Sequence, residues 1–346
     1  MANDPQVPWS DDQWARANQV VQEESKRARV AATFLPLYGP LDADADFVRR
    51  QDISYGMPRS TRGAATADVA TALLEYIAAL GLEENPAAIA ARERIARDQD
   101  ILGPPRLGIH DRDTIRLATL QVLVPVRNAQ MADPEMASVL SLFRRAANVI
   151  ARLEDAIVFR GLAPDNTVVG GFAPPAGVTG LPAVWQITGA EGAEGLWSLT
   201  GPREWFPVSA NPPDLRGHAI VRAVSGAIGR LEQQGHFGPF AAVLGQGLFL
   251  LAQTPDVGSL VMPQDRIIPF LGGGPLLRSS TLDALNGYSG VVVALGGAPI
   301  ELVVASDVNL QFLQLTSEPA FVFRVYEKIA LRIKEPRAIA QLYMQP

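Results

Sequence analysis

The sequence predicts an α+β fold, in which long amphipathic helices pack on antiparallel strands. Apolar residues recur every three or four positions along residues 136–157, which is the period of a helix with one buried face. Near the C-terminus, apolar and polar residues alternate along residues 308–312, which is typical of a strand with one buried face. The 346 residues include 30 Gly and 27 Pro, which indicates many turns and loops between these elements.

The N-terminal part predicts one helix followed by irregular chain. Ser10 and Gln13 have the spacing of a capping box, in which each side chain bonds the backbone N–H of the other, so a helix is expected to begin after Ser10. Its apolar stripe is thin and needs a partner surface, and it consists of Trp14, Ala17, Val21 and Ala28. Residues 42–62 are polar and contain Gly and Pro, which predicts an extended loop.

The middle of the chain predicts further helices separated by linkers. Two Ala-rich helices are expected over residues 64–80 and 85–97, and a strand over residues 115–126. Asp133 and Pro134 form a start signal for the most regular helix, which is expected to end at Gly161. Residues 163–213 are rich in Gly, Pro and Trp without a clear period, which indicates loops and short strands.

The C-terminal half alternates between helical and strand patterns. An amphipathic helix is expected over residues 214–234, short buried strands over 240–244 and 291–295, and a loop over 254–263. The tail predicts long antiparallel strands with one buried and one solvated face, over residues 300–304, 308–312, 321–325 and 329–333. Arg332 and Lys334 are expected on the solvated face of the last of these.

Composition and charge exclude several classes of protein. The net charge is −6, which argues against a surface that binds phosphate backbones through clustered Lys and Arg. Cysteine is absent, which excludes disulfides, thiolate metal sites and cysteine nucleophiles. The N-terminus lacks the basic and apolar regions of a secretory signal, and no apolar run is long enough to span a bilayer. A cytoplasmic protein with no membrane partner is therefore expected.

Metal and phosphate sites are not predicted. The three histidines are His110, His218 and His236, and none belongs to a Glu-x-x-His or His-Glu-x-x-His motif. His236 lies in a Gly-rich turn, where a hydrogen-bonding role is expected, and His218 is expected at the surface or an interface. Residues 272–275 read Gly-Gly-Gly-Pro and lack the Lys and Ser or Thr of a phosphate loop, so a turn is expected there.

No catalytic arrangement is predicted. The chain has no Gly-x-Ser-x-Gly elbow. Glu154 and Asp155 are adjacent on a helix and point about 100° apart, so they are expected not to share a face but to pair with Arg152, Arg160 or a neighbouring subunit. The tryptophans at 185, 197 and 205 are expected to fill a core or an interface.

Three segments together resemble the family 1 encapsulins, shell proteins with the HK97-type capsid fold. They are the helix opening at residues 8–14, the segment from Arg152 to Gly161, and the C-terminal strands from Asp307 to Leu342. The helix at 219–224, the turn at 235–239 and the segment 272–285 also resemble parts of that family, in the same order. Residues 56–108 and 163–213 depart from it, because both segments are longer than in the family.

The resemblance implies an HK97-type organisation of the subunit. The expected parts are an N-terminal helix and arm (1–53), an extended-loop region with a helical insertion (54–108), a peripheral domain with a long spine helix (109–213), an apical domain (214–306) and C-terminal strands that return to the peripheral domain or extended loop (307–346).

The function implied by the resemblance is structural. The subunit is expected to assemble with copies of itself into an icosahedral compartment, with the smallest lattice (T=1) favoured, and to enclose a cargo enzyme that carries a targeting peptide. The cargo classes implied are peroxidases, ferritin-like and hemerythrin-like proteins. No catalysis, no cofactor and no packaged nucleic acid are expected. The alternatives are a phage or prophage capsid protein that packages DNA and, less favoured, a self-contained enzyme.

Two sites are implied by the same resemblance. A loop is expected to line the five-fold pore, with Asp256 as its only charge and hence a weakly acidic ring; the pore residues are Gln253, Thr254, Pro255, Asp256, Val257, Gly258 and Ser259. The apolar residues of the N-terminal helix are expected to form the groove that docks the cargo peptide, and they are Trp14, Ala17, Val21 and Ala28.

Overall fold

The computed structural model divides the chain into two compact units. One consists of Met1–Arg50 and Thr114–Pro346, and the other of Gln51–Asp113. The structure describes residues 7–56, 106–111, 113–162, 184–189, 193–197, 199, 204–209, 216–285, 288–316 and 320–344. The helices predicted over residues 64–80 and 85–97 therefore lie outside the described residues.

Helix α1 (Asp11–Ala28) begins at the predicted capping box. The N–H of Gln13 donates to Ser10 Oγ at 3.3 Å, and the N–H of Ser10 donates to Gln13 Oε1 at 3.0 Å. These two bonds satisfy N–H groups that the first helical turn leaves without partners. Arg29 and Val30 connect α1 to the short helix α2 (Ala31–Phe34).

A five-stranded sheet forms the base of the larger unit. Its central pairs are antiparallel, as predicted, whereas the short strand at one edge runs parallel to its neighbour. The strands lie in the order β1 (Leu37–Tyr38), β12 (Ile300–Leu315), β13 (Ala320–Ile333), β6 (Ala118–Arg127) and β7 (Trp185–Thr188).

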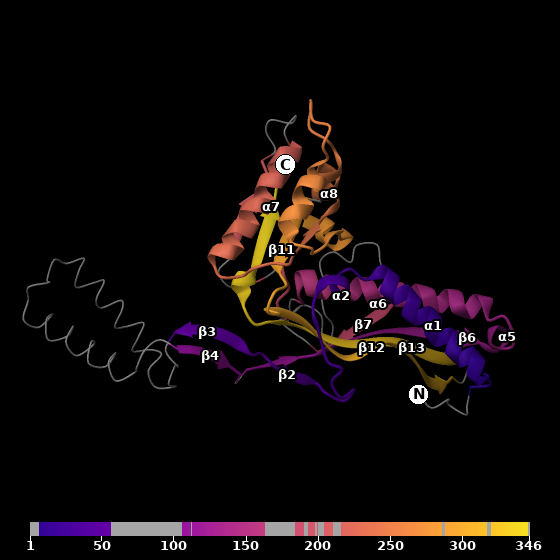
Figure 1. Cartoon of the computed structure of the whole chain (residues 1–346). Helices are drawn as coiled ribbons and strands as arrows, with labels where there is room; N and C mark the ends of the chain where they lie inside the picture. Colours follow the sequence, from indigo (N-terminus) through magenta and orange to yellow (C-terminus); the bar gives the residue numbers. More distant parts are fainter. Residues whose placement is uncertain are drawn as a thin grey trace, which may run out of the picture. The chain divides into compact units, whose positions relative to one another are not determined.

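The long helix α6 (Ala137–Arg160) packs on this sheet against β6 and β13, and α1 packs against α6 and β12 (Figure 1). The helix begins later than predicted, because Asp133 forms a turn first. Its carboxylate accepts hydrogen bonds from the N–H groups of Glu135 and Ala137, and Met136 is left-handed, with φ of 54°. The predicted end at Gly161 is confirmed, and its φ of 70° is one that glycine adopts without strain.

A second five-stranded sheet carries the other helices. Helix α7 (Arg216–Gln233) packs against β8, β11 and β14, and α8 (Gln246–Gln253) against β9 and β11; α9 (Pro263–Ile267) contacts both helices. The strands lie in the order β10 (Leu276–Arg278), β9 (Phe240–Leu244), β11 (Ser289–Ala294), β14 (Ile339–Tyr343) and β8 (Glu204–Pro207).

The remaining elements are short. They comprise α5 (Asn128–Met131), η2 (Ile268–Leu271), η3 (Ser280–Leu285) and η4 (Pro336–Ala338), together with a two-stranded pair of β2 (Phe47–Arg49) and β5 (Thr114–Arg116). In the smaller unit, β3 (Asp52–Gly56) pairs antiparallel with β4 (Arg106–His110).

The C-terminal strands divide between the two sheets, which differs from the predicted organisation. Strands β12 and β13 belong to the first sheet, but β14 pairs with β11 and β8 in the second. Strand β12 already begins at Ile300, so the predicted boundary after residue 306 falls inside a strand. The last strand therefore joins the sheet that contains β9 and β11, both of which lie in the predicted apical domain of residues 214–306.

The prediction that Arg332 lies on a solvated face is wrong. Its side chain is 1% exposed, its Nε donates to Glu301 Oε2 at 3.0 Å, and its guanidinium lies 4.1 Å from the ring centre of Tyr38. Lys334 Nζ also donates to Glu301, at 2.5 Å. This end of the sheet is covered on both faces, because the ring of Tyr38 and a small apolar cluster around Val303 lie on the side that the alternation assigned to water.

Candidate functional site

The apolar stripe of α1 is buried inside its own subunit. Trp14 is 8% exposed and lies edge-on to Phe323, with 5.9 Å between the ring centres, and Ala17 and Val21 are fully buried. Trp9 stacks on Phe323 at 4.8 Å, which closes the cluster from the N-terminal side. Their side chains fill the core between α1, α6 and β13, and the docking role of these residues stays a prediction.

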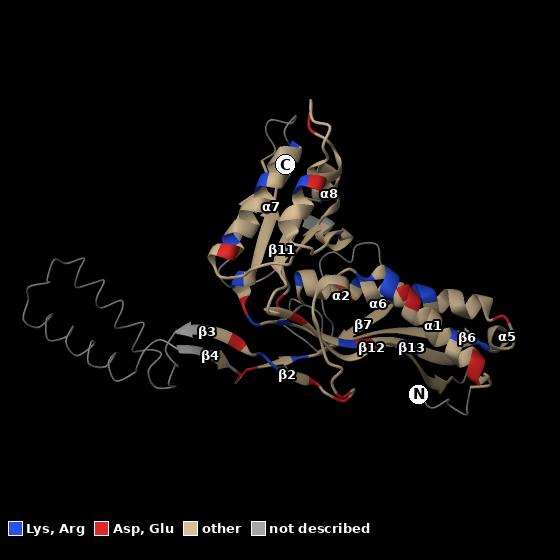
Figure 2. Cartoon of the chain, viewed as in Figure 1, with Lys and Arg blue, Asp and Glu red and all other residues tan. Residues whose placement is uncertain are grey.

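The outer face of α1 is polar. Its exposed residues carry both signs of charge (Figure 2), and Ala28, the fourth predicted docking residue, is only half-buried. The exposed positions are Asp11, Asp12, Ala15, Arg16, Gln19, Glu23, Lys26 and Arg27. A partner that reaches this helix from outside therefore meets charged and amide groups.

The predicted pore loop follows α8 directly. Gln253 is the last residue of that helix, and its amide donates to Gln264 Oε1 on α9; Thr254 Oγ1 donates to the carbonyl of Leu250 at 2.8 Å. The N–H of Ser259 donates to the carbonyl of Asp256 at 2.9 Å, and Gly258 has a φ of 81°. The loop is thus a turn that is fixed at its base by two helices.

Asp256 does not project from this loop as a free charge. Its Oδ1 accepts a hydrogen bond from the backbone N–H of Gly217, in the first turn of α7, at 2.8 Å. A carboxylate at the N-terminus of a helix is stabilised by the helix dipole and by N–H groups that have no partner within the helix. Large apolar side chains are exposed here instead: Val257, in the loop, is 79% exposed, and Leu260, just after it, is fully exposed.

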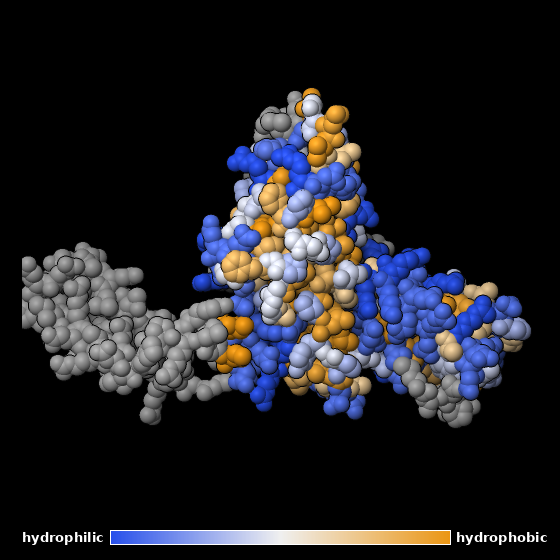
Figure 3. All heavy atoms as spheres, in the orientation of Figure 1, coloured by the Kyte–Doolittle hydropathy of each residue, from blue (hydrophilic) through white to orange (hydrophobic). Residues whose placement is uncertain are grey.

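Apolar side chains gather around this loop. Figure 3 shows apolar surface at the end of the molecule formed by α8 and its following loop. The large apolar residues exposed in this segment are Leu250, Val257, Leu260, Val261 and Met262, which together are named the apolar tip below. An exposed apolar patch of this kind marks a surface on which another molecule packs.

His236 and His218 contact neighbouring protein groups. His236 is buried in the turn after α7, its N–H donates to the carbonyl of Leu231 at 3.0 Å, and burial lowers its pKa although Glu335 lies 4.0 Å away. His218 is exposed, with its Nδ1 3.3 Å from Arg266 Nη2. Among the described residues, no group of His, Asp or Glu side chains is arranged to hold a metal ion.

The glycine segment 272–275 forms a turn, as predicted. It lies between η2 and β10, and a Cβ at Gly274 would meet the carbonyl oxygen of Phe240 at 2.0 Å, so only glycine fits there. The tryptophans also pack locally. The rings of Trp197 and Trp205 lie 5.4 Å apart, and Trp205 contacts Tyr343 at 5.5 Å.

Glu154 and Asp155 contact groups that were not predicted, although the charge of Arg152 does act on Asp155. Asp155 accepts hydrogen bonds from the N–H of Val30 at 3.0 Å and of Ala31 at 2.7 Å, so it caps the start of α2. Arg160, which was expected to pair with one of them, donates to the carbonyl of Thr281. Glu154 instead lies beside Arg29, which follows α1, with 3.8 Å between Oε2 and Nη1.

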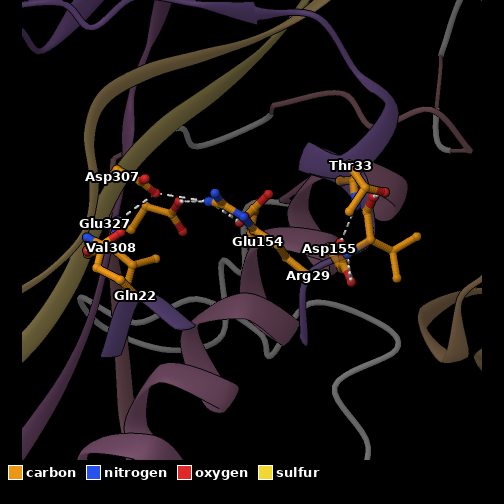
Figure 4. A network of polar contacts seen from close by, with 10 residues as sticks. Gln22, Arg29, Thr33, Glu154, Asp155, Asp307, Val308 and Glu327 are labelled. Carbon is orange, nitrogen blue, oxygen red and sulfur yellow. Dashed lines mark hydrogen bonds and ion pairs between the residues drawn. The ribbon is translucent and has the colours of Figure 1, made fainter. Parts of the chain in front are cut away.

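Arg29 is shared by three carboxylates (Figure 4). Its Nη1 lies 2.9 Å from Asp307 Oδ1, 3.7 Å from Glu327 Oε1 and 3.8 Å from Glu154 Oε2. Both glutamates are buried, whereas Asp307 is half-exposed. Burial disfavours the positive charge of Arg29, but the three carboxylates outweigh this effect and raise its pKa. We name Arg29, Glu154, Asp155, Asp307 and Glu327 the Arg29 cluster.

The Arg29 cluster contains more negative charge than one arginine balances. Burial, then the neighbouring carboxylates Glu327 and Asp155, raise the pKa of Glu154. Burial raises the pKa of Glu327 to about 8, against the effect of Arg29. Burial likewise raises the pKa of Asp155 to about 7, against the two backbone N–H groups that favour its charged form. Sequence reasoning missed this cluster, because its members come from four separate segments.

Comparison with known proteins agrees with this architecture. A family model described as "Encapsulating protein for peroxidase" matches residues 183–330. The type 1 encapsulin shell protein EncA of Myxococcus xanthus is 25% identical over 342 residues, covering 97% of this chain and 93% of the relative.

Solved capsid structures share the fold. The virus-like particle from Pyrococcus furiosus has a TM-score of 0.60 at 13% identity, covering 96% of this chain and 99% of that one. The capsid of Myoviridae phage XM1 has a TM-score of 0.51 at 10% identity, covering 90% of each chain. The fold is therefore the predicted HK97-type capsid fold. Part of the chain thus matches a family model of encapsulating proteins, and nearly all of it is similar to an encapsulin shell protein, so the phage alternative is less favoured.

Proposed function

We propose that this chain assembles into a closed icosahedral compartment that encloses a cargo enzyme, and that the shell itself performs no catalysis. The observation that carries the proposal is the correspondence of nearly the whole chain with an encapsulin shell protein and with a virus-like particle subunit. In the part of the chain that the structure describes, no helix is long and apolar enough to cross a membrane. The compartment is assigned to the cytoplasm.

The apolar tip supplies a reason for assembly. Side chains such as Val257, Leu260 and Met262 are exposed to water in the single subunit, and burial of one such side chain contributes about 1.5–3 kcal/mol. A closed icosahedral shell requires several heterologous contacts per subunit, so copies of the chain cover such surfaces in turn. The lattice assigned is the smallest one (T=1).

The loop of residues 253–259 is assigned to the five-fold pore, and its character is revised from acidic to apolar. The Asp256 carboxylate bonds the N–H of Gly217, whereas Val257 is the large apolar side chain that this segment exposes. An apolar constriction opposes the passage of hydrated ions of either sign. The pore is therefore expected to admit small neutral solutes in preference to cations.

Cargo docking is assigned to the outer face of α1 and its surroundings. The apolar residues of the helix are already buried, so a targeting peptide gains its contacts here from polar groups such as Arg16, Gln19 and Lys26. The cargo classes considered are peroxidases, ferritin-like proteins and hemerythrin-like proteins.

The proposal is tested by sedimentation velocity of the chain expressed without cargo, with absorbance recorded at the protein and nucleic-acid maxima. A single species of shell size with a protein spectrum is expected. A shell-sized species with a nucleic-acid spectrum would favour the phage capsid alternative. A monomer or small oligomer would contradict the proposal.

A further inference from the structure

The junction between α1 and α2 rests on buried carboxyl groups. Arg29 and Val30 connect the two helices, and the side chains beneath them come from α6, β12 and β13. Asp155 holds the N–H groups of Val30 and Ala31, while its neighbour Glu154 faces the guanidinium of Arg29. The attachment of the N-terminal helices to the rest of the subunit therefore depends on the state of this cluster.

Glu154 and Glu327 lack the partners that buried carboxylates need. All four of their oxygens are inaccessible to water, and among the described residues no N–H or hydroxyl group donates a hydrogen bond to any of them. Each lies within 4 Å of Arg29 Nη1, but the closest oxygen to that atom belongs to Asp307, at 2.9 Å. Two unsolvated carboxylates beside one shared cation are unstable when both are ionised.

The charges that face this pair come from every element packed around it. They are Arg29 after α1, Asp155 and Arg152 on α6, and Asp307 on β12. Asp307 and Arg29 form an ion pair with each other, and Asp155 is bonded to backbone N–H groups. Among the described residues, Arg29 is the one cation that pairs with Glu154 or Glu327, because the charge of Arg152 acts on Asp155. A proton is therefore the remaining means of neutralising the pair.

We propose that Glu154 and Glu327 share one proton at neutral pH, and that its release to solvent at alkaline pH loosens the junction of α1 and α2. The proton makes one carboxyl a donor to the other, which gives the buried oxygens the hydrogen bond that no other group provides. Without it, two buried negative charges repel each other, and opening of the junction admits the water that solvates them. The inference concerns the single subunit and is independent of the proposed function.

Two isosteric variants test the shared proton. Glu154→Gln and Glu327→Gln each replace the shared proton with a permanent N–H donor of the same size. Infrared spectroscopy of the full chain at pH 7 is expected to show more absorption from buried, protonated carboxyl groups in the wild type than in either variant. Glu23→Gln, an exposed change on α1, is expected to leave that absorption unaltered.

Hydrogen exchange of the same proteins tests the loosening. Between pH 7 and about pH 9.5, protection of the amides of residues 29–34, corrected for the intrinsic pH effect, is expected to fall about tenfold in the wild type and in Glu23→Gln. In Glu154→Gln and Glu327→Gln the fall is expected to be under about twofold. Equal carboxyl absorption in all proteins, or an equal loss of protection, would overturn the proposal. Because the two variants change different elements, a folding defect in one leaves the other as a test.

Discussion

Arg332 and Glu301 form an ion pair inside the sheet, across adjacent strands, with 3.0 Å between Nε and Oε2. Strands β12 and β13 place the two residues directly opposite each other, and Lys334 donates to the second oxygen of the same carboxylate. Removal of one partner from such a pair leaves a buried charge without compensation, which is more costly than loss of the attraction alone.

Glu301→Ala is therefore expected to destabilise the chain by about 3–5 kcal/mol, because it leaves the buried guanidinium of Arg332 without its carboxylate partner. The midpoint of denaturant unfolding measures the loss. Asp46→Ala removes the exposed partner of Lys328 and serves as the control, for which a much smaller change is expected. Equal changes in the two variants would contradict the assignment of Arg332 to the core.

Stability is expected to fall as pH rises from about 4.5 to about 8. The folded chain raises the pKa of Glu327 from 4.5 to about 8 and that of Asp155 from 3.8 to about 7, mainly by burial. Between those limits the folded state binds more protons than the unfolded state, so the free energy of unfolding decreases with pH. The decrease is on the order of a few kcal/mol.

A series of denaturant unfolding curves between pH 4.5 and pH 9 measures this slope. Glu327→Gln removes the titrating group and is expected to flatten the curve, whereas Glu23→Gln is expected to preserve it. A wild-type stability that rises over this interval would contradict the environment described for Glu327 and Asp155.

Trp14→Ala is expected to lower stability by about 3–5 kcal/mol, since it empties a site packed against Phe323 in the core. Gln19→Ala, an exposed change on the same helix, is expected to have little effect. If Trp14 were a docking residue, its removal would reduce cargo uptake at unchanged stability, and unfolding curves measured beside cargo co-purification separate the two cases.

Charge reversal on the outer face of α1 tests the revised docking surface. A chain with Arg16→Glu and Lys26→Glu is expected to form shells but to retain less cargo, because the exposed groups that a peptide meets have changed sign. The ratio of cargo to shell protein after purification measures the effect. An unchanged ratio would place docking elsewhere.

The pore assignment is tested with Val257→Asp. This change adds a carboxylate at the large apolar side chain that the loop exposes, so metal cations are expected to enter shells several-fold faster, as read by a chelating dye inside. Asp256→Ala removes the bond to the Gly217 N–H and is expected to cost about 1 kcal/mol of stability without slowing cation entry. Slower entry of cations into Asp256→Ala shells would support the original prediction of an acidic ring in the pore.

Local patterns predicted the elements well. The capping box at Ser10, the buried strand at residues 240–244 and the end of α6 at Gly161 all follow from residues near one another in sequence. Alternation likewise predicted strand over four segments near the C-terminus, and the structure joins them in pairs into the two long strands β12 and β13.

Relationships between distant segments were not predictable from these patterns. Arg332 follows the alternation of a solvated position, but the ring of Tyr38, nearly 300 residues away in sequence, lies over its guanidinium. Asp256, in the loop after α8, accepts a hydrogen bond from Gly217 in α7. Asp155 caps α2 at Ala31, which lies 124 residues earlier in the sequence. A single sequence shows the charge of each residue but not the segment that packs over it.

The central claim is that the chain builds a closed shell, and electron microscopy of the purified protein expressed alone tests it most directly. Uniform hollow particles of one diameter, with an absorbance spectrum free of nucleic acid, are the predicted result. Isolated subunits, small oligomers or particles filled with nucleic acid would contradict the account.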